Sequence, residues 1–437
     1  MSKKKTRRGA YLRAIRKAVT GPVQKLRIRM LAGKRRRSRA RFVAVTGSSG
    51  KSPTVHVRGA ILAGHGNVRA QVLRNTVPTL IRTISSLGEE DDFVIAELGV
   101  GSVGDMAPMA RLFRPDVAIV TMVGVEHFSA FRGREGVARE KGALLEALRP
   151  DGLAILNADD PLVMEMGQRT KARIVTFGTG PEADYRVENV AGAYPETLSF
   201  DLVWKGGRLR LVTGFTGHHF WMPVAAAAAA ALELGTAPEQ LCARLPEIGP
   251  VRCRCQLLKA PQGPMFILDT AKAPSATLPL AFDLIAQAKA PYKRIVIGTI
   301  SDYGGSSSPQ YRRAYHRALE IADQVVFVGS SSLRAKPSEE DLASGRYVAC
   351  ATPQEAYEHI RATAREDELI LLKGSSNLHL ERLALAFLHP VRCWELSCGV
   401  KGNCMACGNF TQVFDRKTYR QRRERQSWTF RQGRDGR

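Results

Sequence analysis

A glycine-rich turn between a short apolar segment and a helix constrains this chain more than any other feature. Residues 41–45 predict a strand, residues 46–52 read Thr-Gly-Ser-Ser-Gly-Lys-Ser, and residues 54–62 predict a helix. Backbone N–H groups of such a turn face inward, and the start of the helix adds positive potential, so this element suits a phosphate group. The order of the three elements indicates nucleotide binding, with an ordinary tight turn as the alternative. The loop alone does not separate a GTPase, a kinase and a ligase.

The residues of this turn each have an expected role. Lys51 is expected to reach the β- and γ-phosphates, and the Ser52 hydroxyl to hold Mg²⁺. Pro53 follows near the start of the helix, where a missing N–H costs little. The residues predicted to bind the nucleotide here are Gly47, Ser48, Ser49, Gly50, Lys51, Ser52 and Thr54.

Strands alternate with helices along the first half of the chain. Further strand-like runs lie at 93–96, 117–121, 154–156 and 174–177. This alternation predicts a parallel sheet covered on both faces. Short, turn-separated strands between 183 and 215 indicate an antiparallel insertion, and a second α/β unit starts near residue 252. The predicted fold class is α/β: a P-loop central domain with a mostly parallel sheet, plus a smaller C-terminal Rossmann-like α/β domain.

The length of 437 residues suggests two or three domains. The longest apolar run, Val224–Leu232, is shorter than the roughly 20 residues that span a bilayer, and no secretory signal follows the basic start. We therefore expect an intracellular protein. The predicted parts are a basic arm (1–41), a central domain (42–251), a C-terminal domain (252–392), a Cys-rich knuckle (393–410) and a basic tail (411–437).

The net charge of +24 is concentrated at the two ends of the chain. Residues 1–41 hold 17 Lys and Arg and no acid, and residues 408–437 hold 9 Lys and Arg against 3 acids, which leaves the body nearly neutral. Such ends favour a polyanion as partner, or they are solvated arms without one. Between residues 11 and 31 apolar residues recur among arginines, as in helices that lie on an anionic membrane, and RNA binding is equally compatible.

The eight cysteines do not suggest a disulfide framework in so long a chain without a signal. Four of them fall within fifteen residues: Cys393, Cys398, Cys404 and Cys407. Four thiols in a glycine-containing loop are enough for one tetrahedral Zn²⁺. A Cys₄ zinc site is predicted here, with an iron–sulfur cluster or unliganded redox thiols as alternatives.

A second set of residues carries the chemistry. Glu97 ends one predicted strand, His127 follows another, and Lys141 lies on the next helix. Carboxyl ends of parallel strands meet at one edge of a sheet, where ligands bind. A carboxylate and an imidazole beside a phosphate turn are able to supply ligands to Mg²⁺. Taken singly, each residue also has a purely structural interpretation, as a helix cap, a loop residue or a solvated helix face.

Together these residues resemble the Mur ligase family, most closely its D-alanyl-D-alanine-adding (MurF-like) branch. The likeness spans about residues 42–390. The positions that match, besides the turn, are Glu97 to Gly99, Gly104 to Met106, His127 to Gly142, Leu156 to Pro161, Gly217 to His219, Arg254, Asp269 to Pro274, Lys373 to Ser375 and Glu381.

The resemblance implies an ATP-dependent ligase that joins a carboxylate acceptor to an amine donor, an amino acid or peptide, through an acyl phosphate. It implies ATP and Mg²⁺ as cofactors, with Ser52 and Glu97 on one ion and His127 and Lys141 on a second, and catalytic roles for Lys51, Glu97, His127 and Lys141. The matching lysine of the family is commonly carbamylated, which turns a cation into an anionic ligand. Arg254 and Asp269 are implied as nucleotide contacts.

The chain departs from the family pattern in places that concern the substrate. We expect the family's N-terminal UDP-binding domain to be missing, because only about 41 residues precede the phosphate turn, and the resemblance places Pro223, Lys272 and Pro274 where the family has asparagines. We therefore expect retained phosphoryl chemistry with an altered acceptor, a cell-wall precursor or a polyamide-type chain. The expected location is the cytoplasm, at the inner face of the membrane if the basic ends bind lipid. The alternative is a degenerate ligase scaffold that binds nucleotide and a polyanion.

Overall fold

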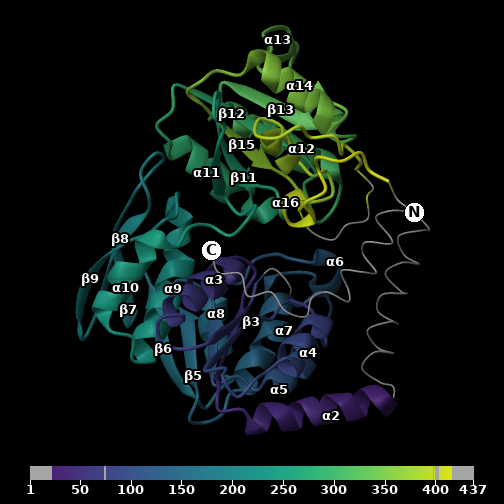
Figure 1. The fold of residues 1–437 in the computed structure, drawn as a ribbon. Helices are drawn as coiled ribbons and strands as arrows, with labels where there is room; N and C mark the ends of the chain where they lie inside the picture. The colour runs from purple at the N-terminus through teal and green to yellow at the C-terminus, as the bar shows by residue number, and fades with distance from the viewer. Residues whose placement is uncertain (1–21, 73–74, 397, 399–402, 416–437) are drawn as a thin grey trace. The chain divides into compact units, whose positions relative to one another are not determined.

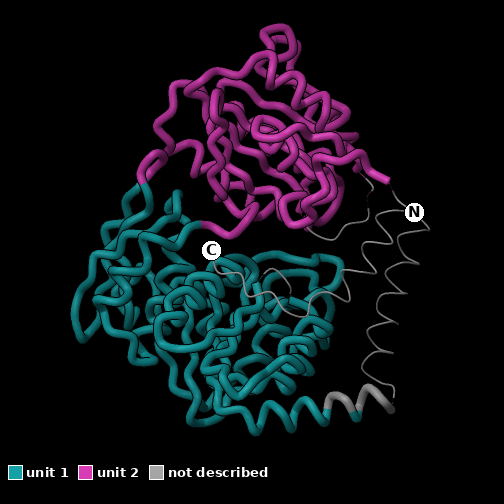
Figure 2. The backbone as a smooth tube through the Cα atoms, viewed as in Figure 1, with its two compact units in different colours: residues 1–192, 197–249 teal, residues 193–196, 250–437 magenta. Residues whose placement is uncertain are grey.

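The structure, a computed structural model, describes residues 22–72, 75–396, 398 and 403–415. The chain divides into two units (Figure 2): unit 1 holds residues 1–192 and 197–249, and unit 2 holds residues 193–196 and 250–437. The predicted start of the second α/β domain, residue 252, lies two residues after the start of the main segment of unit 2.

Unit 1 is built on a nine-stranded sheet in the order β2-β3-β1-β4-β5-β6-β7-β8-β9. Figure 1 labels β3 and β5 to β9 of this sheet. Neighbouring strands are parallel up to β7, and β7, β8 and β9 pair antiparallel. The predicted mostly parallel sheet is confirmed, and the antiparallel strands extend the same sheet. The strands are β1 (Arg41–Thr46), β2 (Val68–Gln71), β3 (Phe93–Glu97), β4 (Val117–Val120), β5 (Leu153–Asn157), β6 (Arg173–Gly178), β7 (Tyr185–Ala191), β8 (Ser199–Trp204) and β9 (Gly207–Val212).

Both faces of the parallel part are covered because its strands are apolar on both sides. Phe42 and Ala44 of β1 belong to the core under α4, α5, α7 and α8. Helices α3 and α9 pack together, α3 contacts β1, β2 and β3, and α9 contacts β5 to β8. The helices of unit 1 are α2 (Pro22–Arg37), α3 (Lys51–Leu62), α4 (Val77–Ser85), α5 (Met106–Phe113), α6 (Phe128–Phe131), α7 (Arg134–Glu146), α8 (Pro161–Gly167), α9 (Trp221–Glu233) and α10 (Pro238–Arg244), with short 3₁₀ turns η1 (His218–Phe220) and η2 (Leu245–Glu247).

The second half of the predicted basic arm is the helix α2, which packs against α4 and α5 of unit 1. Arg35 is buried there: its guanidinium lies 2.9 Å from the Asp116 carboxylate and 3.6 Å from the centre of the Phe42 ring. Leu31 joins the core, while Leu26 and Met30 are exposed. This part of the arm is therefore a structural element of unit 1. The predictions for residues 1–21 and 416–437 lie outside the described residues.

Unit 2 is built on a six-stranded sheet in the order β10-β11-β15-β12-β13-β14, in which only the β10–β11 pair is antiparallel. This is the predicted second α/β domain. Its strands are β10 (Gln256–Lys259), β11 (Met265–Asp269), β12 (Tyr292–Ile297), β13 (Gln324–Val328), β14 (Tyr347–Cys350) and β15 (Glu368–Lys373). Its helices are α11 (Leu278–Gln287), α12 (Ser307–Leu319), α13 (Glu339–Ala343), α14 (Pro353–Thr363), α15 (Glu381–Leu385) and α16 (Cys404–Cys407), with 3₁₀ turns η3 (Ser275–Thr277) and η4 (Ser332–Ala335).

The strand order of unit 1 decides where its polar residues meet. Strand β1 lies between β3 and β4, and all three run in the same direction. Their carboxyl ends carry the phosphate turn, Glu97 and the loop that leads to His127. Among the described residues, no helix is both long and apolar enough to cross a membrane.

Candidate active site

The phosphate turn is held against the end of β4. Gly47 has a φ of 142° and Gly50 a φ of 80°, a backbone conformation that favours glycine. A Cβ on Gly47 would lie 1.9 Å from the Thr121 hydroxyl oxygen. That hydroxyl donates to the carbonyl groups of Thr46 and Ser49. The glycine at position 47 is therefore required by close packing as well as by its φ.

The polar side chains of the turn contact the turn's own backbone. Lys51, the first residue of α3, donates its Nζ to the carbonyl groups of Gly47, at 2.5 Å, and Ser48. The side chain is thus folded over the turn, where a phosphate would meet it. Ser52 is buried at the start of α3, and the Thr54 hydroxyl donates to the Gly50 carbonyl.

Glu97 is placed beside this turn by the register of the sheet. It ends β3 opposite Val45 of β1, and only 2% of its surface is exposed. The backbone after it is fixed from both sides: Leu98 donates its N–H to Val45 and accepts from the Thr46 hydroxyl at 2.8 Å. A buried carboxylate at this point suits a metal ligand.

His127 lies in a loop that the rest of unit 1 holds in place. Its φ is 44°, in the left-handed region, and it caps the short helix α6. The Asp160 carboxylate accepts the N–H of Val123 at 2.7 Å, and Arg134 donates to the Val123 carbonyl at 2.9 Å. The Asn157 side chain donates to the Thr121 carbonyl at 2.8 Å. Asn157 and Asp160 thus position the loop that carries His127.

Lys141 is completely buried on α7, and its Nζ lies 2.6 Å from the carboxylate of Glu126. Burial alone would raise the pKa of Glu126, but the charges of Lys141 and Lys51 outweigh it and hold that pKa below its ordinary value. The positive charge of Lys51 in the phosphate turn contributes to this lowering of the Glu126 pKa. The neighbouring Glu140 accepts the N–H groups of Gly104 and Met106, which fixes α7 in this orientation.

Glu126 is the residue that the sequence prediction missed. It directly precedes His127 in the loop that follows β4, and a carboxylate in a loop has no sequence pattern of its own. It neutralises a buried lysine that would otherwise repel a cation. The geometry therefore brings Glu126 and Lys141 together beside His127, while Lys51 and Glu97 lie at the ends of the neighbouring strands β1 and β3.

Two residues predicted to contact the nucleotide lie in unit 2. Asp269 ends β11 and forms a buried ion pair with Lys373 of β15, at 2.5 Å. The Nε of Arg254 is buried without a hydrogen-bond partner among the described residues. The role expected for both stays a prediction.

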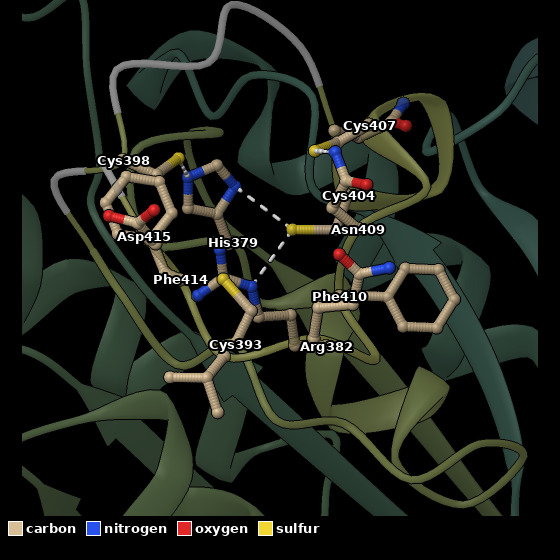
Figure 3. Close-up of a pocket in the computed structure, with 13 residues that line it drawn as sticks. His379, Arg382, Cys393, Cys398, Cys404, Cys407, Asn409, Phe410, Phe414 and Asp415 are labelled. Carbon is tan, nitrogen blue, oxygen red and sulfur yellow. Dashed lines mark hydrogen bonds between the residues drawn. The ribbon is translucent and has the colours of Figure 1, made fainter. Parts of the chain in front are cut away.

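The four clustered cysteines also lie in unit 2. They line one pocket (Figure 3), but of the four only Cys404 belongs to a ligand-spaced group within the described part of the chain, and its companions there are His379 and Glu381. The ligand-spaced group is therefore not the predicted set of four cysteines, and the Cys₄ zinc site stays a prediction. Nothing in the cysteine spacing pointed to His379.

Comparisons with known proteins match both units. The model of the Mur ligase middle domain matches residues 45–231, and the model described as Mur ligase, glutamate ligase domain matches residues 253–376. Together they cover more than half of the chain. The chain belongs to the Mur ligase family. Mur ligases are ATP-dependent acid–amino acid ligases that use Mg²⁺, and at the family level they ligate cell-wall precursors.

Individual relatives place this Mur ligase near one branch of the family. It is 27% identical to the UDP-N-acetylmuramoyl-tripeptide--D-alanyl-D-alanine ligase of Mycobacterium leprae, over 78% of this chain and 72% of the relative. It is 26% identical to the enzyme of the same name from Escherichia coli, over 81% and 78%. The crystal structure of MurF from Acinetobacter baumannii superposes with a TM-score of 0.73 at 26% identity, over 83% of this chain and 80% of that one.

Gly47→Ala tests the packing of the phosphate turn. The added methyl group would collide with Thr121, so we expect the Kd for ATP, measured by isothermal titration calorimetry, to rise at least about tenfold. Gly124→Ala is the matched control, because its Cβ would meet the Ser48 Cβ at an ordinary 3.4 Å. Equal affinities for the two variants would contradict this description of the turn.

Glu126→Gln tests the buried ion pair through its pH dependence. Lys141 would keep an uncompensated buried charge, so we expect a loss of about 3 kcal/mol in unfolding free energy at neutral pH. The folded-state pKa of Glu126 lies below the unfolded one. The carboxylate's contribution is therefore present above the ordinary glutamate range and disappears as the pH falls through the folded value.

Urea unfolding of both proteins over a series of pH values measures this difference. Glu135→Gln, at an exposed glutamate on α7, the helix that carries Lys141, should change the unfolding free energy by less than about 0.5 kcal/mol. A Glu126→Gln loss that stays constant into the acid range would show that the charge of Glu126 is not what stabilises the fold.

Proposed function

We propose that this Mur ligase joins a substrate carboxylate to an amine through an acyl phosphate. The acceptor is the carboxylate of a cell-wall precursor or polyamide-type chain, and the amine belongs to an amino acid or peptide. The observation that carries this proposal is the arrangement at the carboxyl edge of the unit 1 sheet. There the phosphate turn, Glu97 and the buried Glu126–Lys141 pair occupy the ends of adjacent strands or the elements packed on them.

The proposed reaction has two steps. An oxygen of the acceptor carboxylate attacks the γ-phosphorus of ATP, and the bond to the bridging oxygen breaks, which leaves ADP and the acyl phosphate. The amine then attacks the acyl carbon, phosphate leaves, and the amine loses a proton as the amide forms. Both partners of the first step are anionic, so positive charge must be gathered between them. Lys51 and the N–H groups of the turn supply part of it.

Divalent cations would supply the remainder. We propose that Ser52 and Glu97 hold one Mg²⁺, and that His127 and Lys141 serve a second. The residues fit this assignment, because Glu97 is a buried carboxylate beside the turn and Lys141 is buried within the site. When bound, Mg²⁺ neutralises phosphate charge and orients the oxygens of the displacement.

The state of Lys141 follows from its partner. As an unmodified cation it is neutralised by Glu126. A carbamate on Lys141 would instead place a second negative charge beside the buried Glu126 carboxylate. Only a cation is able to neutralise these two anionic groups. We therefore propose that carbamylation of Lys141 and occupancy by the second Mg²⁺ depend on each other.

The relatives make a muramoyl peptide one natural acceptor to test. Two of them are named as ligases that act on UDP-N-acetylmuramoyl-tripeptide and D-alanyl-D-alanine. The resemblance places Lys272 and Pro274 where the family has the asparagines of its hinge motif, which supports an altered substrate, and it places Pro223 at an asparagine position near the nucleotide base. We propose action in the cytoplasm, at the inner face of the membrane if the basic ends bind anionic lipid.

A second candidate function, a polyanion-binding scaffold without turnover, is favoured by one surface of unit 1. A pocket at the amino ends of the strands is lined by seven arginines and three acids. Its less buried arginines are Arg36, Arg39, Arg41, Arg114, Arg149 and Arg173. Nucleotide binding without phosphate release, together with salt-sensitive binding of RNA or anionic vesicles, would favour this function over the ligase.

Phosphate release tests the ligase function. In a screen of carboxylate and amine pairs that includes muramyl peptides and polyglutamate, we expect release to need Mg²⁺, an acceptor and an amine together. Lys141→Ala should lower the rate at least about 100-fold, because a metal ligand is lost, and small carboxylates should restore part of it. Lys171→Ala, an exposed lysine of unit 1, is the control. Normal turnover by Lys141→Ala would refute the assignment of the second metal.

A further inference from the structure

A buried group of metal-ligating side chains lies in unit 2, and none of its members has a role in the reaction proposed above. One ligand atom each of His379, Glu381 and Cys404 lies within 4.8 Å of the others, and all three residues are buried. The Nδ1 of His379 is 3.5 Å from the Cys404 sulfur and 3.6 Å from a carboxylate oxygen of Glu381. His379 has a φ of 51°, so its backbone adopts an uncommon conformation that gives the ring this position.

The distances suit a zinc ion. Zinc binds sulfur at about 2.3 Å and imidazole nitrogen at about 2.0–2.1 Å, so a tetrahedral ion holds these two atoms about 3.5 Å apart. The Cys404 sulfur and His379 Nδ1 are separated by that distance. The three residues therefore already stand at the spacing of ligands around an ion.

The remaining cysteines surround the same place. A pocket of about 210 Å³ is lined by His379, Arg382 and all four clustered cysteines (Figure 3). Cys398 lies on the far side of the imidazole, with its sulfur 3.4 Å from Nε2. The two ring nitrogens point in different directions, so an ion on Nδ1 leaves Nε2–H to donate to Cys398. Metal-binding histidines usually have such a partner on the second nitrogen, since it fixes the tautomer.

Neighbouring side chains contact the Cys404 and Glu381 ligands. The Arg382 guanidinium donates to the Cys404 sulfur at 3.0 Å, an interaction that stabilises a thiolate. One oxygen of Glu381 accepts the N–H of Cys404 at 2.7 Å. Its other oxygen is buried without a hydrogen-bond partner among the described residues. A buried carboxylate oxygen without a partner is costly, and a bound cation would satisfy it.

We propose that unit 2 binds one zinc ion through His379 Nδ1, Glu381 and Cys404, with the fourth ligand a thiolate of Cys393 or Cys407. Cys398 is a positioning residue that acts through the imidazole. This mixed set replaces the four-cysteine site that the spacing predicts. It rests on unit 2 alone and is independent of the proposed ligase function.

The site would attach the segment after α15 to unit 2. Cys393 pairs its backbone with Phe410, Trp394 stacks on Tyr357 of α14, and Met405 packs on the core of the unit. Cys404, between these contacts, is the ligand that this segment offers to His379. Because the ion would bind only the folded arrangement, its removal should destabilise the protein.

The test is the metal content of the full chain. After dialysis against zinc and then zinc-free buffer, elemental analysis should find about one zinc per chain. His379→Ala and Cys404→Ser should lose it, while Cys398→Ser should retain it with about 10- to 100-fold weaker affinity. Cys242→Ser, a cysteine of unit 1, is the matched control and should keep full zinc.

Two further measurements keep the result interpretable. His379→Cys retains a metal-binding side chain at position 379. Zinc binding by this variant would show that the loss of zinc in His379→Ala does not come from misfolding. Far-UV circular dichroism checks the fold of each variant. Absorption of the Co²⁺-substituted protein should show two thiolate ligands. Full zinc in His379→Ala with loss in Cys398→Ser would overturn the proposal in favour of four cysteines. A wild-type protein that holds no zinc, or holds iron instead, would also overturn it.

Discussion

The position of β1 between two parallel neighbours determines what unit 1 is able to do. Three strands with the same direction bring their carboxyl ends to one edge, and each end carries a different polar element: the phosphate turn, Glu97 and the loop to His127. The helices cannot bring these groups together by themselves. The close approach of Gly47 to Thr121 then joins the turn to β4. A fold with another strand order would separate the same residues.

Within this arrangement the buried pair of Glu126 and Lys141 is the main electrostatic feature. Removing two charges from water costs several kcal/mol for each, and their attraction offsets that cost only when both partners are present. The pair follows β4, which is the sheet neighbour of the strand that leads into the phosphate turn, so a triphosphate and its cations bound there would add further charge nearby. In the structure the charges of Glu126 and Lys141 neutralise each other. A change in the charge of Lys141 would leave the Glu126 carboxylate without its counter-charge. This links the state of one lysine to the metal that the chemistry needs.

The two α/β units and the position of the phosphate turn could be predicted from the sequence, because the patterns that indicate them are local. The alternation of strands and helices led to the two α/β units, and the turn from Gly47 to Ser52 lies where its pattern placed it. Glu126 was missed because a carboxylate in a loop has no pattern of its own, and only packing shows that it faces Lys141. The helix α2 was interpreted as an arm because its arginines look solvated in sequence, whereas Arg35 is buried on Asp116. His379 was missed for the same reason, since only the fold brings it to Cys404.

The central claim is that the edge of the unit 1 sheet gathers two divalent cations beside a triphosphate. The most direct measurement is the number of Mn²⁺ ions, standing in for Mg²⁺, that the zinc-loaded protein binds with a non-hydrolysable ATP analogue, followed by electron paramagnetic resonance. The account predicts two ions for the wild-type protein and one for Lys141→Ala. A single ion in the wild-type protein, unchanged in that variant, would contradict it.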